Sequence, residues 1–226
     1  MIDVVITCYN YGRYLNESIN SIINQKFPPK TLTIVDDGSN DAATRVFISN
    51  ILDKYDFGLI NPYVLSTRYQ GLSRARNNGI RIGGAPYICC LDADDYISIN
   101  YFTEILKVFE SNSDASIVTP FVQLFGDESN LWKTSASEFA DLLLENTYAV
   151  SSVFKRSDWD RIKGYDENMK HGYEDWDLWL SILKSGGTGC VSPDTYLFHR
   201  KHGYTMTSSA KEKHADIYNY ITNKHL

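Results

Sequence analysis

The sequence of 226 residues contains little cysteine and no zinc-binding pattern. Its four cysteines are Cys8, Cys89, Cys90 and Cys190, and no two of them form a CxxC pair, which argues against a structural zinc site. Cys89 and Cys90 are adjacent within an expected strand, so their side chains should point to opposite faces as buried free thiols. We therefore expect a reduced, cytoplasmic protein.

Long apolar runs are also missing. No stretch approaches the ~18 apolar residues that a membrane-spanning helix needs. The sequence opens with MIDVVITCYN, in which no basic segment precedes an apolar signal core. We therefore predict no transmembrane segment, and peripheral contact with the inner face of a membrane is the alternative to a location wholly in the cytoplasm.

There is no excess of positive charge. The 22 basic and 28 acidic residues give a formal net charge of -6, whereas nucleic-acid binding needs a basic face. We expect no nucleic-acid partner. No GxGxxG follows an expected strand, which excludes a dinucleotide site of the Rossmann type. A nucleotide-sugar-forming transferase would need a glycine-rich loop after the first strand, where this chain has residues 8–12, CYNYG.

What the chain has is a regular alternation of strand-like and helix-like segments. The alternation predicts an α/β fold, a mostly parallel sheet with helices on both faces, and ligands at the carboxyl ends of the strands. Beyond Phe121 the pattern loosens into a mixed region to Tyr204, followed by a polar helical tail from Lys211 to Asn223. The expected strands are 2–7, 31–35, 63–65, 87–91 and 115–119, and the expected helices are 14–24, about 41–55 with a cap among residues 39–41, 72–82, and 100–110 capped by Ser98.

Two acidic clusters follow expected strands. Asp92, Asp94 and Asp95 repel one another unless a positive group shares their site, and a hard cation such as Mg²⁺ or Mn²⁺ takes oxygen ligands and can bridge a diphosphate. The alternative is an acidic loop that caps the next helix. In the second cluster, Gly38 allows a tight turn and Asp37 can accept the imino hydrogen of a pyrimidine, unless it merely caps a helix.

Three later segments also carry polar groups suited to a site. Residues 71–80 open a helix with Arg74 and Arg76, which suits a diphosphate or else forms an exposed basic face. Glu174 and Asp175 lie in the first turn of another helix, where the helix dipole alone explains them and where a carboxylate base would also stay ionised. Residues 198–202, FHRKH, offer histidines for a metal shell or simply for the surface.

Taken in order, six segments resemble the inverting family 2 glycosyltransferases of the GT-A fold. They are residues 5–10, 35–39, 75–80, 91–95, 174–179 and 200–202, and they span most of the chain. The resemblance implies a GT-A domain over 1–226, with a nucleotide-sugar-binding half over about 1–119, an acceptor-binding half over about 120–205, and a helical tail over 206–226.

The resemblance also implies a role for each matched donor-site residue. Thr7, Tyr9 and Asp37 would hold the nucleobase, with the Tyr9 ring against it. Arg76 would lie in the nucleotide pocket, with Arg74 as a rival, and Asp92 would contact the ribose or the donor sugar.

Further roles follow for the metal and the acceptor. Asp94 and His202 would bind a divalent metal, Mn²⁺ or Mg²⁺, although His199, which stands where the family has a tyrosine, leaves the choice of histidine open. Asp175 would be the catalytic base, and Glu174 and Trp176 would face the acceptor.

The implied activity is transfer of a sugar from a nucleotide diphosphate donor, first of all a UDP-sugar, to a hydroxyl of a glycan or lipid-linked glycan in bacterial surface polysaccharide or glycolipid synthesis. The processive polymerases of the family carry a QxxRW motif and membrane helices; neither occurs here, which favours a non-processive enzyme. Two alternatives stay open. One is a catalytically degenerate carbohydrate- or nucleotide-binding module. The other is an aspartyl-nucleophile phosphatase, although Asp95 and Tyr96 stand where such enzymes have Thr or Val.

Overall fold

The parallel half of the sheet forms first along the chain. The computed structural model describes residues 1–203 and 205–226. Its first four strands are β1 (Ile2–Cys8), β2 (Thr31–Asp36), β3 (Asn61–Ser66) and β4 (Tyr87–Asp92), which lie in the order β3-β2-β1-β4 with every pairing parallel. β1 and β2 are buried along their whole length, as expected for apolar strands covered on both faces.

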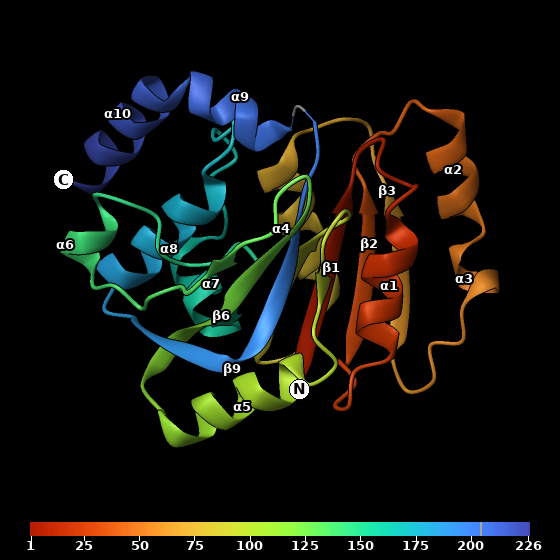
Figure 1. The fold of residues 1–226 in the computed structure, drawn as a ribbon, viewed down its shortest axis with the longest axis horizontal. Helices are drawn as coiled ribbons and strands as arrows, with labels where there is room; N and C mark the ends of the chain where they lie inside the picture. Colours follow the sequence, from red (N-terminus) through yellow and green to blue (C-terminus); the bar gives the residue numbers. More distant parts are fainter. Residues whose placement is uncertain (204) are drawn as a thin grey trace.

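Helices cover both faces of these strands (Figure 1). On the face to which Cys89 points, the sheet is covered by α1 (Leu15–Ile23) and α5 (Tyr101–Ser111). On the opposite face, to which Cys90 points, it is covered by α4 (Leu72–Ile82) and α8 (Glu174–Lys184). The two adjacent cysteines therefore lie in different cores, as predicted, and all four cysteines are free. The remaining helices of the first half are α2 (Ala42–Ser49) and α3 (Ile51–Lys54).

Beyond β4 the sheet becomes mixed. Within the described part of the chain it has nine strands, and the path continues β4-β8-β6-β9-β5, with β8 antiparallel to both of its neighbours and β9 parallel to β6. These strands are β5 (Tyr96–Ile97), β6 (Ala115–Gly126), β7 (Leu131–Trp132), β8 (Val153–Lys155) and β9 (Thr188–Lys201). The helices here are α6 (Phe139–Leu142), α7 (Arg156–Ile162), α9 (Met206–Glu212) and α10 (His214–His225).

Several expected boundaries were wrong. The helix expected over about 41–55 is divided at Asn50, whose side chain donates to the Val46 carbonyl and so competes with the helical backbone bonds. Ser98 does not cap α5, because its hydroxyl bonds the Thr195 hydroxyl at 2.6 Å and the cap residue is Asn100. The strand expected over 115–119 continues to Gly126.

The helical tail is two helices that meet at Lys213, where one was expected. By contrast, the helix over 72–82 was predicted with its correct ends, and Asp41 caps α2 through the Thr44 amide. The expected end of the mixed region, Tyr204, lies outside the described residues. Among the residues that are described, no helix is long and apolar enough to cross a membrane.

Candidate active site

The carboxyl ends of β1, β2 and β4 bring the two acidic clusters together. Thr7 on β1 is in register with Val35 on β2 and with Asp92 on β4, so Asp37 and Asp92 each lie one strand away from β1. Parallel strands end at the same edge of a sheet, which is where open α/β sheets bind ligands. The sequence predicted this convergence, and the structure confirms it.

Asp37 is held by backbone amides from the start of α4. Its two carboxylate oxygens accept hydrogen bonds from the amides of Gln70 and Gly71, each at 2.8 Å. Burial raises the pKa of Asp37, and these amides oppose that rise. The approach depends on Gly38, which has φ +78° and where a Cβ would lie 2.3 Å from the amide nitrogen of Tyr69.

An exposed aromatic pair lies beside Asp37. Tyr9 follows β1 and is 41% exposed, and its ring centroid is 4.8 Å from that of Tyr69. Tyr69 was not anticipated from the sequence; its position directly before the amides that bind Asp37 was the available signal. The two rings offer flat apolar surface on which a base can stack.

The three aspartates of the DADD cluster diverge to three different partners. Asp92 accepts from Arg76, Asp94 lies 2.9 Å from His202 Nε2, and Asp95 lies 2.8 Å from His199 Nδ1. Burial, and then the nearby Asp92 carboxylate, raises the pKa of Asp94. This divergence reduces the mutual repulsion expected of adjacent carboxylates.

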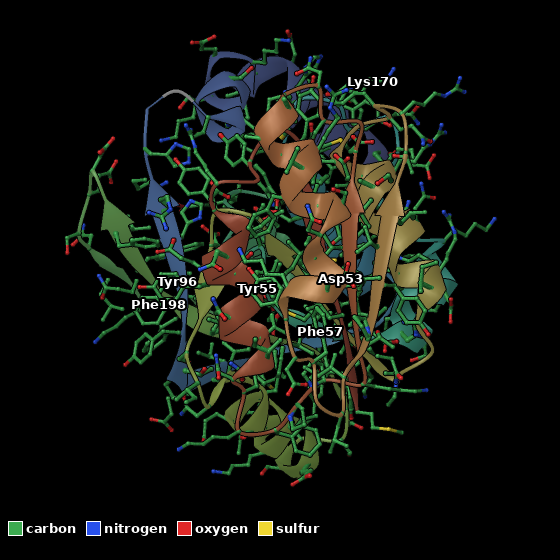
Figure 2. The ribbon with its side chains drawn as sticks, turned by 90° about the vertical axis from the view of Figure 1, so that its right-hand side faces the viewer. Asp53, Tyr55, Phe57, Tyr96, Lys170 and Phe198 are labelled. Carbon is green, nitrogen blue, oxygen red and sulfur yellow. The ribbon has the colours of Figure 1, made fainter. Side chains whose placement is uncertain are left out.

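Asp95 connects the loop after β4 to β9. It is fully buried, and besides His199 it accepts the Arg200 amide at 2.9 Å, which ties β9 to the loop after β4. Burial raises the pKa of Asp95 to about 6, and its hydrogen bond to His199 raises the pKa of that imidazole in spite of burial. Tyr96 on β5 and Phe198 on β9, seen at the sheet edge in Figure 2, stack with ring centroids 4.5 Å apart and fasten these two strands.

His202 is the histidine that approaches Asp94. The ring centroids of Tyr11 and Tyr14 lie 5.6 and 5.2 Å from that of His202, so aromatic rings hold this half-buried imidazole beside Asp94. Within the described residues, no three His, Cys, Asp or Glu side chains gather closely enough to hold a metal by themselves. Asp94 and His202 could supply two ligands to a Mn²⁺ or Mg²⁺ ion, because such ions commonly combine few protein ligands with substrate phosphates and water.

Arg76 joins the donor side of the site to α8. It is 1% exposed, and it donates to Asp92 Oδ1 at 2.8 Å and to Glu174 Oε1 at 2.5 Å. Burial lowers the pKa of Arg76, but the two carboxylates more than offset this and hold it charged. Arg74, the rival, is half-exposed and pairs with Glu167 away from the site.

Asp175 follows Glu174 in the first turn of α8. The helix begins after Gly172 and Tyr173, both at positive φ, a backbone conformation that is costly for tyrosine. Burial raises the pKa of the half-buried Asp175 to about 7, the Glu174 carboxylate raises it further, and Arg76 opposes the rise. A carboxyl group with this pKa is suited to proton transfer near neutral pH.

Two expected acceptor contacts were wrong in placement. Glu174 is 5% exposed and is engaged by Arg76, so it does not face an open surface. Trp176 is 3% exposed, and its indole nitrogen donates to the Leu142 carbonyl at 2.7 Å. Successive residues of an α-helix point about 100° apart, so Asp175 can remain partly exposed while both of its neighbours are buried.

The comparisons with known proteins agree with this architecture. A profile of glycosyl transferase family 2 matches residues 3–172. An uncharacterised glycosyltransferase of Haemophilus influenzae is 30% identical over 189 residues, which cover 81% of this chain and 72% of that protein. The crystal structure of Staphylococcus aureus TarS 1-349 in complex with UDP-GlcNAc superposes with a TM-score of 0.74 at 17% identity, covering 92% of this chain and 60% of that one.

Two longer relatives have assigned names. The poly-β-1,6-N-acetyl-D-glucosamine synthase of Staphylococcus epidermidis is 24% identical over 74% of this chain and 42% of its own length. The minor teichoic acid biosynthesis protein GgaB of Bacillus subtilis is 28% identical over 92% of this chain and 24% of its own length. The fold is therefore the GT-A fold of glycosyltransferases. The chain belongs to glycosyl transferase family 2.

Proposed function

We propose that this chain is an inverting, non-processive glycosyltransferase that moves a sugar from a UDP-sugar to a hydroxyl of a glycan or lipid-linked glycan. The observation that carries the proposal is the buried chain of ion pairs from Asp92 through Arg76 to Glu174. It joins the carboxyl end of β4, where the donor would bind, to the first turn of α8, which carries Asp175. The donor side of the proposed site and its proposed base are thereby held together.

The charges support a single displacement. Asp175 accepts the proton of the acceptor hydroxyl while that oxygen attacks the anomeric carbon of the donor sugar. The bond from the anomeric carbon to the diphosphate breaks as the new glycosidic bond forms, so the configuration inverts. Asp37 and Tyr9 would hold the nucleobase, and Thr7, at the end of β1, lies between them and Asp92.

A divalent cation completes the proposal. Asp94 and His202 would hold Mn²⁺ or Mg²⁺, and the ion would supply positive charge against the diphosphate leaving group. The relatives named for polysaccharide and teichoic acid synthesis support a role in making bacterial surface polymers or glycolipids. The phosphatase alternative is less well supported, because Asp92, the nucleophile it would need, is engaged by Arg76.

Thermal unfolding with UDP, UDP-GlcNAc and GDP, each with and without MnCl₂, tests the binding half of the proposal. A ligand at 100 times its dissociation constant stabilises by about 2.7 kcal/mol, and we expect UDP with Mn²⁺ to produce a shift that UDP alone does not. Asp94→Asn should lose the metal-dependent part, and Asp53→Asn, on the exposed α3 side seen in Figure 2, should retain it. Absence of any nucleotide effect would contradict the proposal.

Asp175→Asn tests the chemical half. It should keep the UDP-GlcNAc shift and lose sugar transfer by about a hundredfold or more, the usual contribution of a general base. Transfer is measured as UDP release over a panel of glycan and lipid-linked acceptors. A variant that retained most of the wild-type rate would require another base.

A further inference from the structure

The immediate surroundings of Asp175 include a polar partner from another element. Asn146, in the loop between α6 and β8, donates from Nδ2 to Asp175 Oδ2 at 3.1 Å. Nothing in the sequence around Asn146 resembles a motif, and the function described above leaves it without a role. The Trp176 backbone amide also donates to this carboxylate, so Asn146 is the side chain from another element that contacts it.

The orientation of the Asn146 amide is fixed by its other end. Its Oδ1 accepts the Tyr148 backbone amide at 3.2 Å, and only the carbonyl end of an asparagine side chain can accept. The NH₂ group must therefore face Asp175. A donor in this position favours the ionised form of the carboxylate.

The loop that carries Asn146 is well anchored. The Ser135 amide donates to the Thr147 carbonyl, the Tyr148 hydroxyl donates to the Ser137 carbonyl at 3.1 Å, and the Ala149 amide donates to the Thr119 hydroxyl at 3.0 Å. Gly189 on β9 makes room for the Tyr148 ring, since a Cβ there would lie 1.9 Å from the hydroxyl. Asn146 is thus held before any substrate arrives.

We propose that Asn146 is the positioning residue of the base: it orients Asp175 and holds the carboxylate in its ionised, proton-accepting form. The inference rests on the proposed function for the reaction that Asp175 serves. It assigns to Asn146 the task that a fixed hydrogen-bond partner performs for the base in many enzymes.

The charged and titratable groups around Asp175 shift its pKa in both directions. Glu174 on α8 and Asp92 on β4 disfavour its ionisation, and Arg76 on α4 and the Trp176 amide favour it. The phenol of Tyr173, also beside Asp175, is itself affected by that carboxylate. Asn146 adds a neutral side-chain donor to this set, so its removal should shift the balance toward the protonated form of Asp175.

The test compares Asn146→Ala, Asn146→Asp and the control Leu144→Ala, an exposed position in the same loop. Each is made with and without Asp175→Asn, and urea unfolding is measured from pH 5 to 9. For each variant, the difference in the free energy of unfolding between the forms without and with Asp175→Asn follows the titration of the Asp175 carboxyl group. We expect its midpoint to rise by about one pH unit in Asn146→Ala, since a hydrogen bond to a charged group differentiates the protonation states by about tenfold.

Asn146→Asp distinguishes the effect of the amide nitrogen, which donates to Asp175, from that of the oxygen, which accepts from Tyr148. It retains an acceptor for the Tyr148 amide but places a second carboxylate against Asp175, so the midpoint should rise further than in Asn146→Ala. Leu144→Ala should leave it unchanged. An unchanged midpoint in both Asn146 variants would overturn the inference.

Enzymatic measurement distinguishes this inference from the proposed function. With UDP-GlcNAc and an acceptor found by the panel, the acidic limb of kcat/KM should move to higher pH in Asn146→Ala by the same amount as the unfolding midpoint. A lower rate with an unmoved acidic limb would overturn the positioning role. Complete inactivity of the wild-type protein would refute the proposed function, while the unfolding titration still decides the role of Asn146.

Discussion

Arg76 shows how a single residue can connect two parts of a site. The resemblance implies a place for it in the nucleotide pocket, and its guanidinium is buried between Asp92 and Glu174. A buried ion pair is expensive to desolvate, and it is much more expensive to leave half-made. Arg76 therefore determines where Asp92 and the start of α8 lie.

Arg76→Met should lower the free energy of unfolding by about 3–5 kcal/mol, because it leaves Glu174 buried without a partner. The double variant Arg76→Met, Glu174→Gln should recover part of that loss, since the uncompensated charge is then removed. Arg74→Met is the matched control, and its exposed ion pair with Glu167 should contribute no more than ~1 kcal/mol. Urea unfolding at neutral pH measures all three. A small loss in Arg76→Met would mean that water reaches Glu174.

At the scale of the elements, α4 must lie close to the sheet for Arg76 to reach β4. Gly79, one turn further along the helix, allows this, because a Cβ there would lie 2.5 Å from Val5 Cγ1 and 2.9 Å from Val35 Cγ2. Both valines belong to the core on this face. Glycine is unfavourable within a helix, so here close packing outweighs helix propensity.

Gly79→Ala should accordingly destabilise the protein by about 1–3 kcal/mol through overpacking, although propensity alone predicts a gain of about 1 kcal/mol. Adding Val5→Ala should make the two changes less than additive, because the smaller side chain gives the new methyl group room. Chemical denaturation of the two single variants and the double variant measures the coupling. A stabilised Gly79→Ala would show that α4 can move outward freely.

The sequence predicted the elements whose signal is local. The β-branched runs of β1 and β2 and the apolar period of α4 needed no tertiary information, and the strand ends located Asp37 and Asp94. The partners of Glu174 and Asp175 could not be predicted, because Arg76 and Asn146 reach them across separate elements. Likewise, His199 and His202 are three residues apart, and only the course of β9 decides which of them approaches Asp94.

For the molecule as a whole, Asp175 makes the free energy of unfolding depend on pH. Its pKa is raised from 3.8 to about 7 in the folded protein, so between these values the folded state binds more protons than the unfolded chain. The stabilising contribution is fully present below the unfolded pKa, and it is lost as the pH rises through about 7. The ionised form, which the proposed base would need, is therefore the form that the fold disfavours.

Asp175→Asn should become more stable relative to the wild type as the pH rises from 5 to 8, and the difference should level off above the folded pKa. Urea unfolding at each pH measures this. The exposed Asp53→Asn is the control and should show no comparable trend. A difference independent of pH would mean that Asp175 is ionised throughout this range.

The placement of β1 between β2 and β4 has a geometric consequence. Adjacent strands lie about 4.8 Å apart, so two intervals separate the strand ends that precede Asp37 and carry Asp92 by ~10 Å. Under the proposed function, the sheet therefore sets the interval between the contact to the nucleobase and the contact to the ribose or sugar. Loops beyond the strands can differ in sequence while that interval stays constant.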